Sequence, residues 1–304
     1  MTTHEAIQPE ATSAADAETI AAYWASQPQS YAKEHGGTTF VRPDGVVVTV
    51  PRRSREYFEE ADRTFFEWNY PYHDETGPFG RLFPYARYRG RQVLEVGCGQ
   101  GCMASLWAER GANLTAVDLN PDAIAATRER FAQQGLPGDI RQVDARQLPF
   151  EDATFDYVYS WGVLHHSPNL GRSVGELMRV LKPGGEFGVM LYNRHSVLYW
   201  YQIRYLEGLL HAERRSLSPL QLASRYTDGD RQEGNPHTWP VTSREMRRMF
   251  GLYSSRLDVR VFGVDIEPIL TLIAPGLPRL IPKVVWKAWG RRWGWSLWIS
   301  GTRA

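Results

Sequence analysis

The sequence predicts an α/β fold of the Rossmann-like, doubly wound kind, and three observations support this. Between Arg91 and Tyr192, short apolar segments alternate with segments of helical spacing, a pattern typical of a parallel sheet covered on both faces. The first apolar segment ends in a glycine-rich turn that leads into a helix. The composition, with 42% hydrophobic residues and a net charge of +1, excludes a disordered chain.

About ninety residues precede this core, and they are rich in aromatic side chains. A helix is predicted from Ser13, and the run TTFVRPDGVVVTV is predicted to form two short strands around a tight turn. A second helix is predicted from Ser54. We expect residues 1–90 to form an N-terminal extension of helices and a hairpin that serves as a lid over the substrate.

Residues 91–192 contain the predicted core of the sheet. Its five strands are QVLEVG, LTAVDL and the segments 139–143, 155–159 and 186–192. Asn120-Pro121 is a suitable start for a crossover helix, because Asn can cap it and Pro fits its first turn. A further helix from about Asn169 to Leu181 is expected to end before the turn KPGG.

The alternation of strands and helices pauses after Tyr192. Residues 193–241 form an aromatic-rich insertion, in which a helix is predicted from His195 to Arg215. Residues 242–304 are expected to complete the sheet, because RLDVRVFGV and WGWSLWIS are the candidate antiparallel pair of strands. The prediction is therefore a seven-stranded sheet with an antiparallel last strand and an inserted helix, VVWKAWGRRW, before it.

The glycine turn carries the functional argument. A strand that ends in GxGxG at Gly97–Gly101 brings backbone close to a ligand and directs free N–H groups at it, which suits a cofactor containing adenosine. Asp118 ends the second strand, where a carboxylate can accept hydrogen bonds from both ribose hydroxyls. Asp144 ends the third strand and could meet the adenine amino group. All three features fall where open α/β sheets bind their ligands.

These motifs resemble those of the class I S-adenosylmethionine-dependent methyltransferases, especially the bacterial small-molecule branch that includes the quinone methyltransferases. The matching segments are LEVGCGQG, AVDLNP, VDARQLPF, FDYVYSWGVLHHSPN and ELMRVLKPGG. The resemblance implies that S-adenosyl-L-methionine is the cofactor. The cofactor-binding residues that it implies are Glu95, Gly97, Cys98, Gly99, Gly101, Asp118, Leu119, Asp144, Ala145, Gln147, Ser160 and Trp161.

Two other interpretations use the same features. An NAD-dependent dehydrogenase would need the pattern GxGxxG, but position 102 is cysteine. A protein without catalytic activity could use the fold as an S-adenosylmethionine-binding scaffold.

Candidate catalytic residues follow from the position of the methyl donor in the resembling family. His165 is a candidate general base because histidine titrates near neutral pH, and Tyr201 is a second candidate. His166 is interpreted as part of a structural LHH turn. Methyl transfer requires no metal, and none is predicted. The candidate substrate-binding residues are Tyr23, Trp24, Tyr31, Tyr199 and Tyr205.

The aromatic flanks predict a small, hydrophobic or aromatic acceptor molecule. If a carbon is methylated, aromatic faces can stabilise the resulting cation, so C-methylation of a prenylated, terpenoid or aromatic natural product of secondary metabolism is one hypothesis. The alternative is O- or N-methylation of a quinone or phenolic compound, with His165 as base. The sequence leaves the acceptor, the methylated atom and the use of a base open.

The sequence gives weaker evidence about nucleic acid, membranes and protein partners. Nucleic acid is not expected as a substrate, because SWGVLHH lacks the Asn/Asp-Pro-Pro-aromatic tetrad of amino-methylating DNA enzymes. The first 30 residues lack Lys and Arg, unlike a signal peptide, so a cytoplasmic location is expected. The basic and tryptophan-rich segment 283–293 could contact a membrane surface, but we interpret it as a helix that packs its tryptophans on the core. A homo-oligomer is expected.

Overall fold

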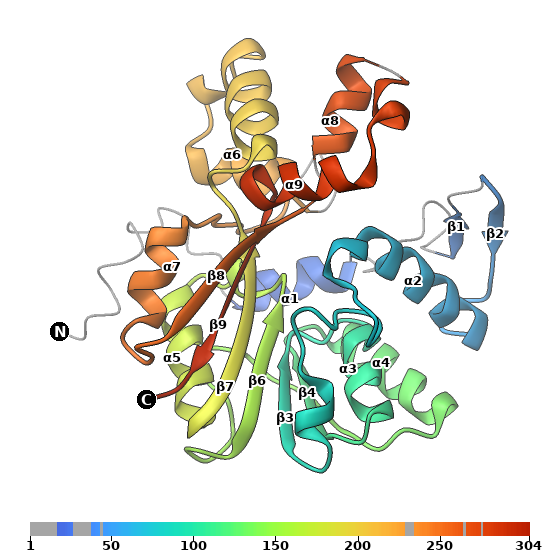
Figure 1. The fold of residues 1–304 in the computed structure, drawn as a ribbon, viewed down its shortest axis with the longest axis vertical. Coiled ribbons are helices and arrows are strands. Elements are labelled where there is room, and N and C mark those ends of the chain that lie inside the picture. The colour runs from blue at the N-terminus through green and yellow to red at the C-terminus, as the bar shows by residue number, and fades with distance from the viewer. Residues whose placement is uncertain (1–16, 27–37, 43–44, 229–233, 264–265, 275) are drawn as a thin grey trace.

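The computed structural model describes residues 17–26, 38–42, 45–228, 234–263, 266–274 and 276–304. A seven-stranded sheet in the order β5-β4-β3-β6-β7-β9-β8 forms the centre of the molecule (Figure 1). Its strands are β3 (Gln92–Val96), β4 (Asn113–Asp118), β5 (Asp139–Gln142), β6 (Phe155–Trp161), β7 (Leu181–Tyr192), β8 (Leu257–Phe262) and β9 (Ser296–Thr302). The first five pair in parallel, and β9 runs antiparallel between β7 and β8. The predicted fold class is confirmed.

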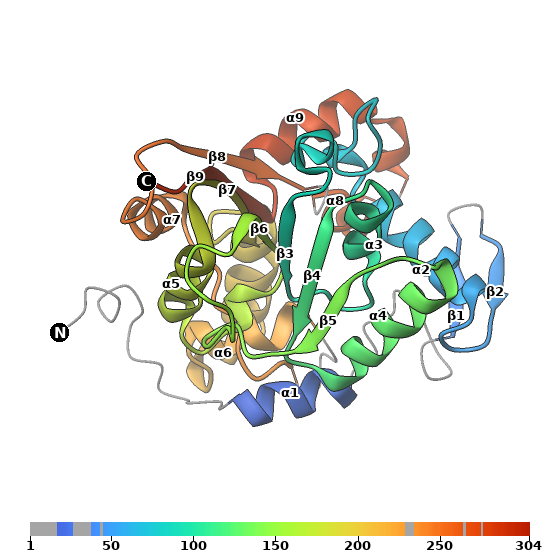
Figure 2. The ribbon, with the colours of Figure 1, turned by 90° about the horizontal axis from the view of Figure 1, so that it is seen from below.

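Helices cover both faces of the sheet (Figure 2). One face carries α3 (Cys102–Glu109) and α4 (Pro121–Gln134), and the opposite face carries α5 (Leu170–Val180) and α7 (Ser243–Phe250). Successive strand residues point to opposite faces, so Trp298 packs with Trp107 of α3 while Leu297 packs with Phe250 of α7. Two apolar layers result, and the burial of these side chains drives the assembly of the sheet.

The strand order reverses at β3 and β6, which are neighbours in the sheet. Crossovers that leave β3 and β6 therefore run to opposite halves of the sheet. In open α/β sheets such a switch point opens a crevice at the carboxyl ends of the strands, where ligands bind. The loops after β3, β4, β5 and β6 all reach this edge.

The N-terminal extension has the predicted kinds of element within its described part. It contains α1 (Ala17–Ser26), the antiparallel pair β1 (Thr39–Val41) and β2 (Val47–Thr49), α2 (Arg55–Trp68), and the 3-10 turns η1 (Tyr70–Tyr72) and η2 (Tyr85–Tyr88). The Ser54 hydroxyl accepts the N–H of Tyr57 and so caps α2. Arg130 of α4 is fully buried, and its Nη1 lies 2.6 Å from Oδ2 of Asp62, which ties α2 to the core.

The KPGG segment differs from its expected place in a turn before the fifth strand. Strand β7 already begins at Leu181, which pairs with Phe155, and pairing resumes at Glu186 with Tyr157. The residues between form an irregularity within the strand, helped by the positive φ of 75° at Gly184.

The insertion and the segment between β8 and β9 form two projections beyond the sheet (Figure 1). The first contains η4 (Leu198–Leu210), η5 (Glu213–Arg215) and α6 (Pro219–Tyr226), and the second contains α8 (Ile266–Ile273), η6 (Leu277–Leu280) and α9 (Lys283–Trp293). In α9 Trp286 is buried whereas Trp293 is exposed, so only part of this helix packs as expected. No helix in the described segments is long and apolar enough to cross a membrane.

Candidate functional site

A cavity of about 470 Å³ lies at the carboxyl edge of the sheet, at the switch point between β3 and β6. This volume falls in the range of small-molecule binding sites. The glycine loop, the ends of β4 and β5, and the loop after β6 line it together with Ile20, Ala21 and Trp24 of α1. The Asn120 side-chain amide donates to the carbonyl of Trp24, at 2.9 Å, which holds α1 against this edge.

The glycine loop is fixed in a form that only glycine adopts without strain. Gly97 has a φ of 84°, and a Cβ at this position would lie 2.2 Å from Cγ2 of Val163. Gly101 has a φ of 76° and precedes the first turn of α3. The backbone N–H groups of Gly97 and Cys98 both donate to the carbonyl of Val117, so the loop stays pressed against β4.

Asp118 and Glu95 place two carboxyl groups at the floor of the cavity. Asp118 accepts the N–H of Gly99 at 2.9 Å and the N–H of Asn120 at 2.8 Å. Burial raises the pKa of Asp118, although these backbone hydrogen bonds oppose the shift. Glu95 is also buried, and burial, with a further contribution from Asp118, raises the pKa of Glu95 well above its ordinary value. Among the described residues, Glu95 Oε2 has no hydrogen-bond partner.

Asp144 and Arg146 form a second polar group on the cavity wall. Burial acts to raise the pKa of Asp144, but the Arg146 guanidinium and its backbone N–H outweigh burial and lower it. The Nη2 of Arg146 lies 2.8 Å from Oδ2 of Asp144. Asp144 therefore remains ionised at neutral pH, with lone pairs left for a donor on a ligand.

The structure brings together nine of the residues expected to bind the cofactor, all of which line the cavity. These are Glu95, Gly97, Cys98, Gly99, Asp118, Leu119, Asp144, Ala145 and Trp161. The other three do not line it. Gly101 faces Thr127, Gln147 is exposed, and the buried hydroxyl of Ser160 donates to the carbonyl of Val96.

The structure places His165, the expected catalytic base, outside the lining of the cavity. Its side chain is fully buried and does not line the cavity, and its ring centroid lies 3.8 Å from that of Tyr192. Burial, followed by the neighbouring His166 and His237, lowers the pKa of His165 well below its ordinary value. In the turn η3 (Leu164–His166), neighbouring side chains point in different directions, so it is His166 that lines the cavity.

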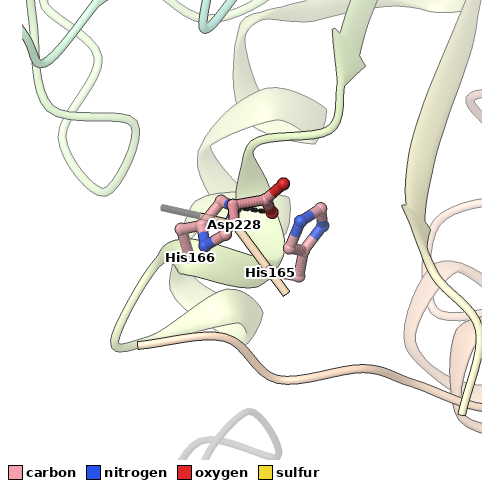
Figure 3. Close-up of side chains that lie close together, drawn as sticks. All are labelled: His165, His166 and Asp228. Atoms are coloured by element: carbon pink, nitrogen blue, oxygen red, sulfur yellow. Dashed lines mark ion pairs between the residues drawn. The ribbon is translucent and has the colours of Figure 1, made fainter. Parts of the chain in front are cut away.

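His166 forms a pair with Asp228 (Figure 3). Its Nδ1 lies 2.9 Å from the carbonyl oxygen of His237 and 3.0 Å from the hydroxyl of Thr238. A carbonyl can only accept, so Nδ1 carries a proton and Nε2 is the basic nitrogen when the ring is neutral. This Nε2 lies 3.3 Å from Oδ2 of Asp228, which also accepts the Tyr192 hydroxyl at 2.6 Å. Tyr192 and Asp228 line the cavity as well.

His165, His166 and Asp228 place one possible metal-ligating atom each within 4.8 Å of one another (Figure 3). Both nitrogens of His166, however, already have partners in the structure. We therefore interpret His166 and Asp228 as a polar side-chain pair on the cavity wall rather than as metal ligands.

The expected substrate residues are divided among several places. Trp24 lines the cavity, and its ring centroid lies 4.9 Å from that of His166. Tyr23 contacts Trp24 edge-on but does not line the cavity, and Tyr31 lies outside the described residues.

The aromatic residues of the insertion do not reach the cavity, contrary to expectation. Tyr199 lines a separate hollow of about 240 Å³ with Arg194 and Arg204. Tyr201 and Tyr205 pack against each other, with ring centroids 6.0 Å apart. Helix η4 is wound as a π-helix, so its side chains follow a different period from the α-helix that the sequence predicts.

Comparisons with known proteins agree with this geometry. Residues 94–189 match the family model described as a methyltransferase domain. A ubiquinone biosynthesis O-methyltransferase of Pseudomonas aeruginosa is 31% identical over 143 residues, which are 44% of this chain and 62% of that protein. A sterol 4-C-methyltransferase of Caenorhabditis elegans is 41% identical over 96 residues, which are 31% of this chain and 29% of that protein. The chain thus spans less than two thirds of the length of these curated relatives.

A solved structure supports the fold. A SAM-dependent methyltransferase from Methanosarcina mazei aligns with a TM-score of 0.51 at 20% identity, over 73% of this chain and 98% of that one. Residues 94–189 thus carry the similarity to methyltransferase domains. The fold and the cavity are similar to those of class I S-adenosylmethionine-dependent methyltransferases.

The residues present fit the cofactor of this class. The glycine loop leaves room for close approach at Gly97, and two carboxylates, Asp118 and Asp144, stand at neighbouring strand ends on the same cavity. S-adenosylmethionine carries hydroxyl, amino and ammonium groups, and carboxylates can accept hydrogen bonds from these donors.

Proposed function

We propose that this chain transfers a methyl group from S-adenosylmethionine to a hydroxyl group of a small, largely apolar acceptor. One observation carries the proposal: the His166–Asp228 pair and the cofactor-binding features line the same cavity. Because a proton-accepting pair has a use in hydroxyl methylation, its position favours an oxygen nucleophile.

The chemistry divides between cofactor and protein. When bound, S-adenosylmethionine supplies a methyl group on positively charged sulfur, which needs in-line alignment in a dry site rather than further activation. Trp24 and its helix line the cavity and would limit the access of water to a bound acceptor. His166 Nε2 would accept the proton that the acceptor hydroxyl loses when its oxygen is methylated. Asp228 stabilises the imidazolium, which later releases the proton to solvent.

Two further histidines lie close to His166. Burial lowers the pKa of His165 well below its ordinary value and, with His166, lowers the pKa of His237 to about 4. Both of these rings are therefore neutral near pH 7 and place no positive charge beside His166. The other groups that face it are the Asp228 carboxylate and the Tyr192 phenol.

The nature of the acceptor is inferred from the lining. Trp24, Trp161 and Tyr192 present aromatic surface to the cavity, which suits an apolar or aromatic molecule. The relative named as a ubiquinone biosynthesis O-methyltransferase supports the same class of acceptor.

Carbon methylation is the second candidate. The same three aromatic rings could stabilise a carbocation, and one relative is named as a sterol 4-C-methyltransferase. The two candidates differ in the need for a base, which gives an experiment.

We would incubate the full chain with methyl-labelled S-adenosylmethionine and a panel of phenols, hydroquinones and isoprenoid alkenes, and identify the methylated atom. His166→Gln should lower the rate of O-methylation by about a hundredfold or more. His165→Gln is the matched control and should leave most of this rate.

Two readouts do not depend on turnover. S-adenosylhomocysteine affinity should be unchanged in His166→Gln, and nitrogen NMR should show the Nδ1-protonated tautomer of neutral His166. A C-methylated product formed equally well by His166→Gln would overturn the O-methylation proposal in favour of the second candidate.

A further inference from the structure

Two projections rise from the sheet in the same direction, along the long axis of the molecule (Figure 1). One consists of η4, η5 and α6, and the other of α8, η6 and α9. We call residues 209–216, from the end of η4 to the segment before α6, the first tip, and residues 276–282, between α8 and α9, the second tip.

Both tips expose large aliphatic side chains. Leu209 and Leu210 are exposed on the first tip, and Leu210 is 57% exposed. On the second tip Leu280 is 79% exposed, and Leu277 is exposed as well. Single exposed apolar residues are ordinary, but aliphatic side chains gathered at the ends of two parallel projections indicate an interaction surface.

Cations accompany these aliphatic side chains on each tip. Arg214 and Arg215 are exposed on the first tip, and Arg279 on the second. Within the part of the chain that the structure describes, the three arginines form no ion pair. The one acidic residue of the two tips, Glu213, is partly buried and accepts the Tyr226 hydroxyl at 2.6 Å. Both tips are therefore apolar and positively charged.

We propose that the two tips dock this protein on the surface of an anionic lipid bilayer. Aliphatic side chains at the tips would enter the interface, and the arginines would meet the anionic headgroups. Both tips point the same way, so one planar surface can contact them together (Figure 1). Nucleic acid would pair with the arginines but would leave the exposed leucines without an apolar contact. The proposal goes beyond methyl transfer and does not depend on it.

The experiment is co-sedimentation of the full chain with vesicles of phosphatidylcholine, alone or mixed with phosphatidylserine, without cofactor. We expect binding to the mixed vesicles that weakens as salt rises, and little binding to phosphatidylcholine alone. Removing cations in Arg214→Gln/Arg215→Gln should weaken binding by about fivefold for each charge. Leu277→Ser/Leu280→Ser should weaken it by at least as much.

Matched control variants come from exposed positions outside the tips. Arg55→Gln and Leu252→Ser change side chains that are also exposed, and both variants should bind vesicles like the unaltered chain. The midpoint of urea unfolding should be similar in all variants, which shows that lost binding does not come from lost structure.

Three outcomes would overturn the proposal. The first is no binding to the mixed vesicles at low salt, and the second is equal loss of binding in the control variants. The third is light scattering that shows a dimer of the unaltered chain and a monomer of the tip variants, because a second copy would then cover the tips. None of these outcomes bears on cofactor binding, which is measured separately.

Discussion

Replacing Asp118 with alanine removes a carboxylate that the structure uses to hold its own ligand loop. Each oxygen accepts one backbone N–H, from Gly99 at 2.9 Å and from Asn120 at 2.8 Å. Hydrogen bonds to a charged group each contribute about 1.5–3 kcal/mol to stability. Because the site is 9% exposed and water replaces part of the lost contacts, we expect a loss of about 2–4 kcal/mol in the free energy of unfolding.

Ligand affinity adds a separate effect. We propose that the remaining lone pairs of Asp118 accept the ribose hydroxyls of the cofactor, and these contacts exist only in the complex. Their loss should raise the dissociation constant of S-adenosylhomocysteine by about ten- to a hundredfold, equivalent to about 1.5–3 kcal/mol. Isothermal titration calorimetry measures this constant, and urea unfolding measures the stability.

Two further variants separate the effects. Asp118→Asn keeps the shape but offers only one acceptor oxygen, so it should lie between alanine and the natural residue in both measurements. Asp258→Ala removes an exposed carboxylate on β8 that pairs with Arg260, and it should leave the affinity unchanged. An Asp118→Ala protein that binds S-adenosylhomocysteine as tightly as the unaltered chain would refute the role of this carboxylate.

Other predictions concern stability. The pKa of Glu95 is higher in the folded protein than in the unfolded chain. At a pH between these two pKa values, the folded protein therefore holds one more proton than the unfolded chain. The free energy of unfolding falls as the pH rises through this interval. Glu95→Gln should remove this dependence of stability on pH, which amounts to at most about 1.4 kcal/mol per pH unit. Urea unfolding from pH 5 to pH 8 measures it. If the free energy of unfolding changed with pH in the same way for both proteins, the assignment would be contradicted. Gly97→Ala should lower stability by more than Gly135→Ala, because both glycines have positive φ but only at Gly97 would a Cβ meet another side chain. Equal urea midpoints for these two variants would show that Val163 moves aside freely.

Local sequence patterns were sufficient to predict the fold. The spacing of apolar residues in strands and helices depends on residues that are close in sequence. The structure agrees with the predictions made from this spacing for the parallel core, the capped helix α2 and the antiparallel pair β8 and β9. The residues expected to bind the cofactor at the strand ends could also be predicted from the sequence. Parallel strands bring Glu95, Asp118 and Asp144 to one edge of the sheet.

The acceptor side of the cavity could not be predicted in the same way. Asp228 meets His166 across 62 residues of chain, and it stands in a polar run without any periodic signal. The choice between His165 and His166 depends on the orientation of one 3-10 turn, which spacing does not specify. The sequence also predicted that three tyrosines of the insertion would reach the cavity, namely Tyr199, Tyr201 and Tyr205. They lie on a π-helix, in which a different set of side chains shares a face than in the expected α-helix.

Titrating the full chain with S-adenosylhomocysteine in a calorimeter examines the cofactor site without any assumption about the acceptor. We expect one binding site per chain, with a dissociation constant below about 1 mM and a clear loss of affinity in Asp118→Ala. No binding heat at higher ligand concentrations, from protein shown to be folded, would contradict the assignment of this cavity to a sulfonium nucleoside.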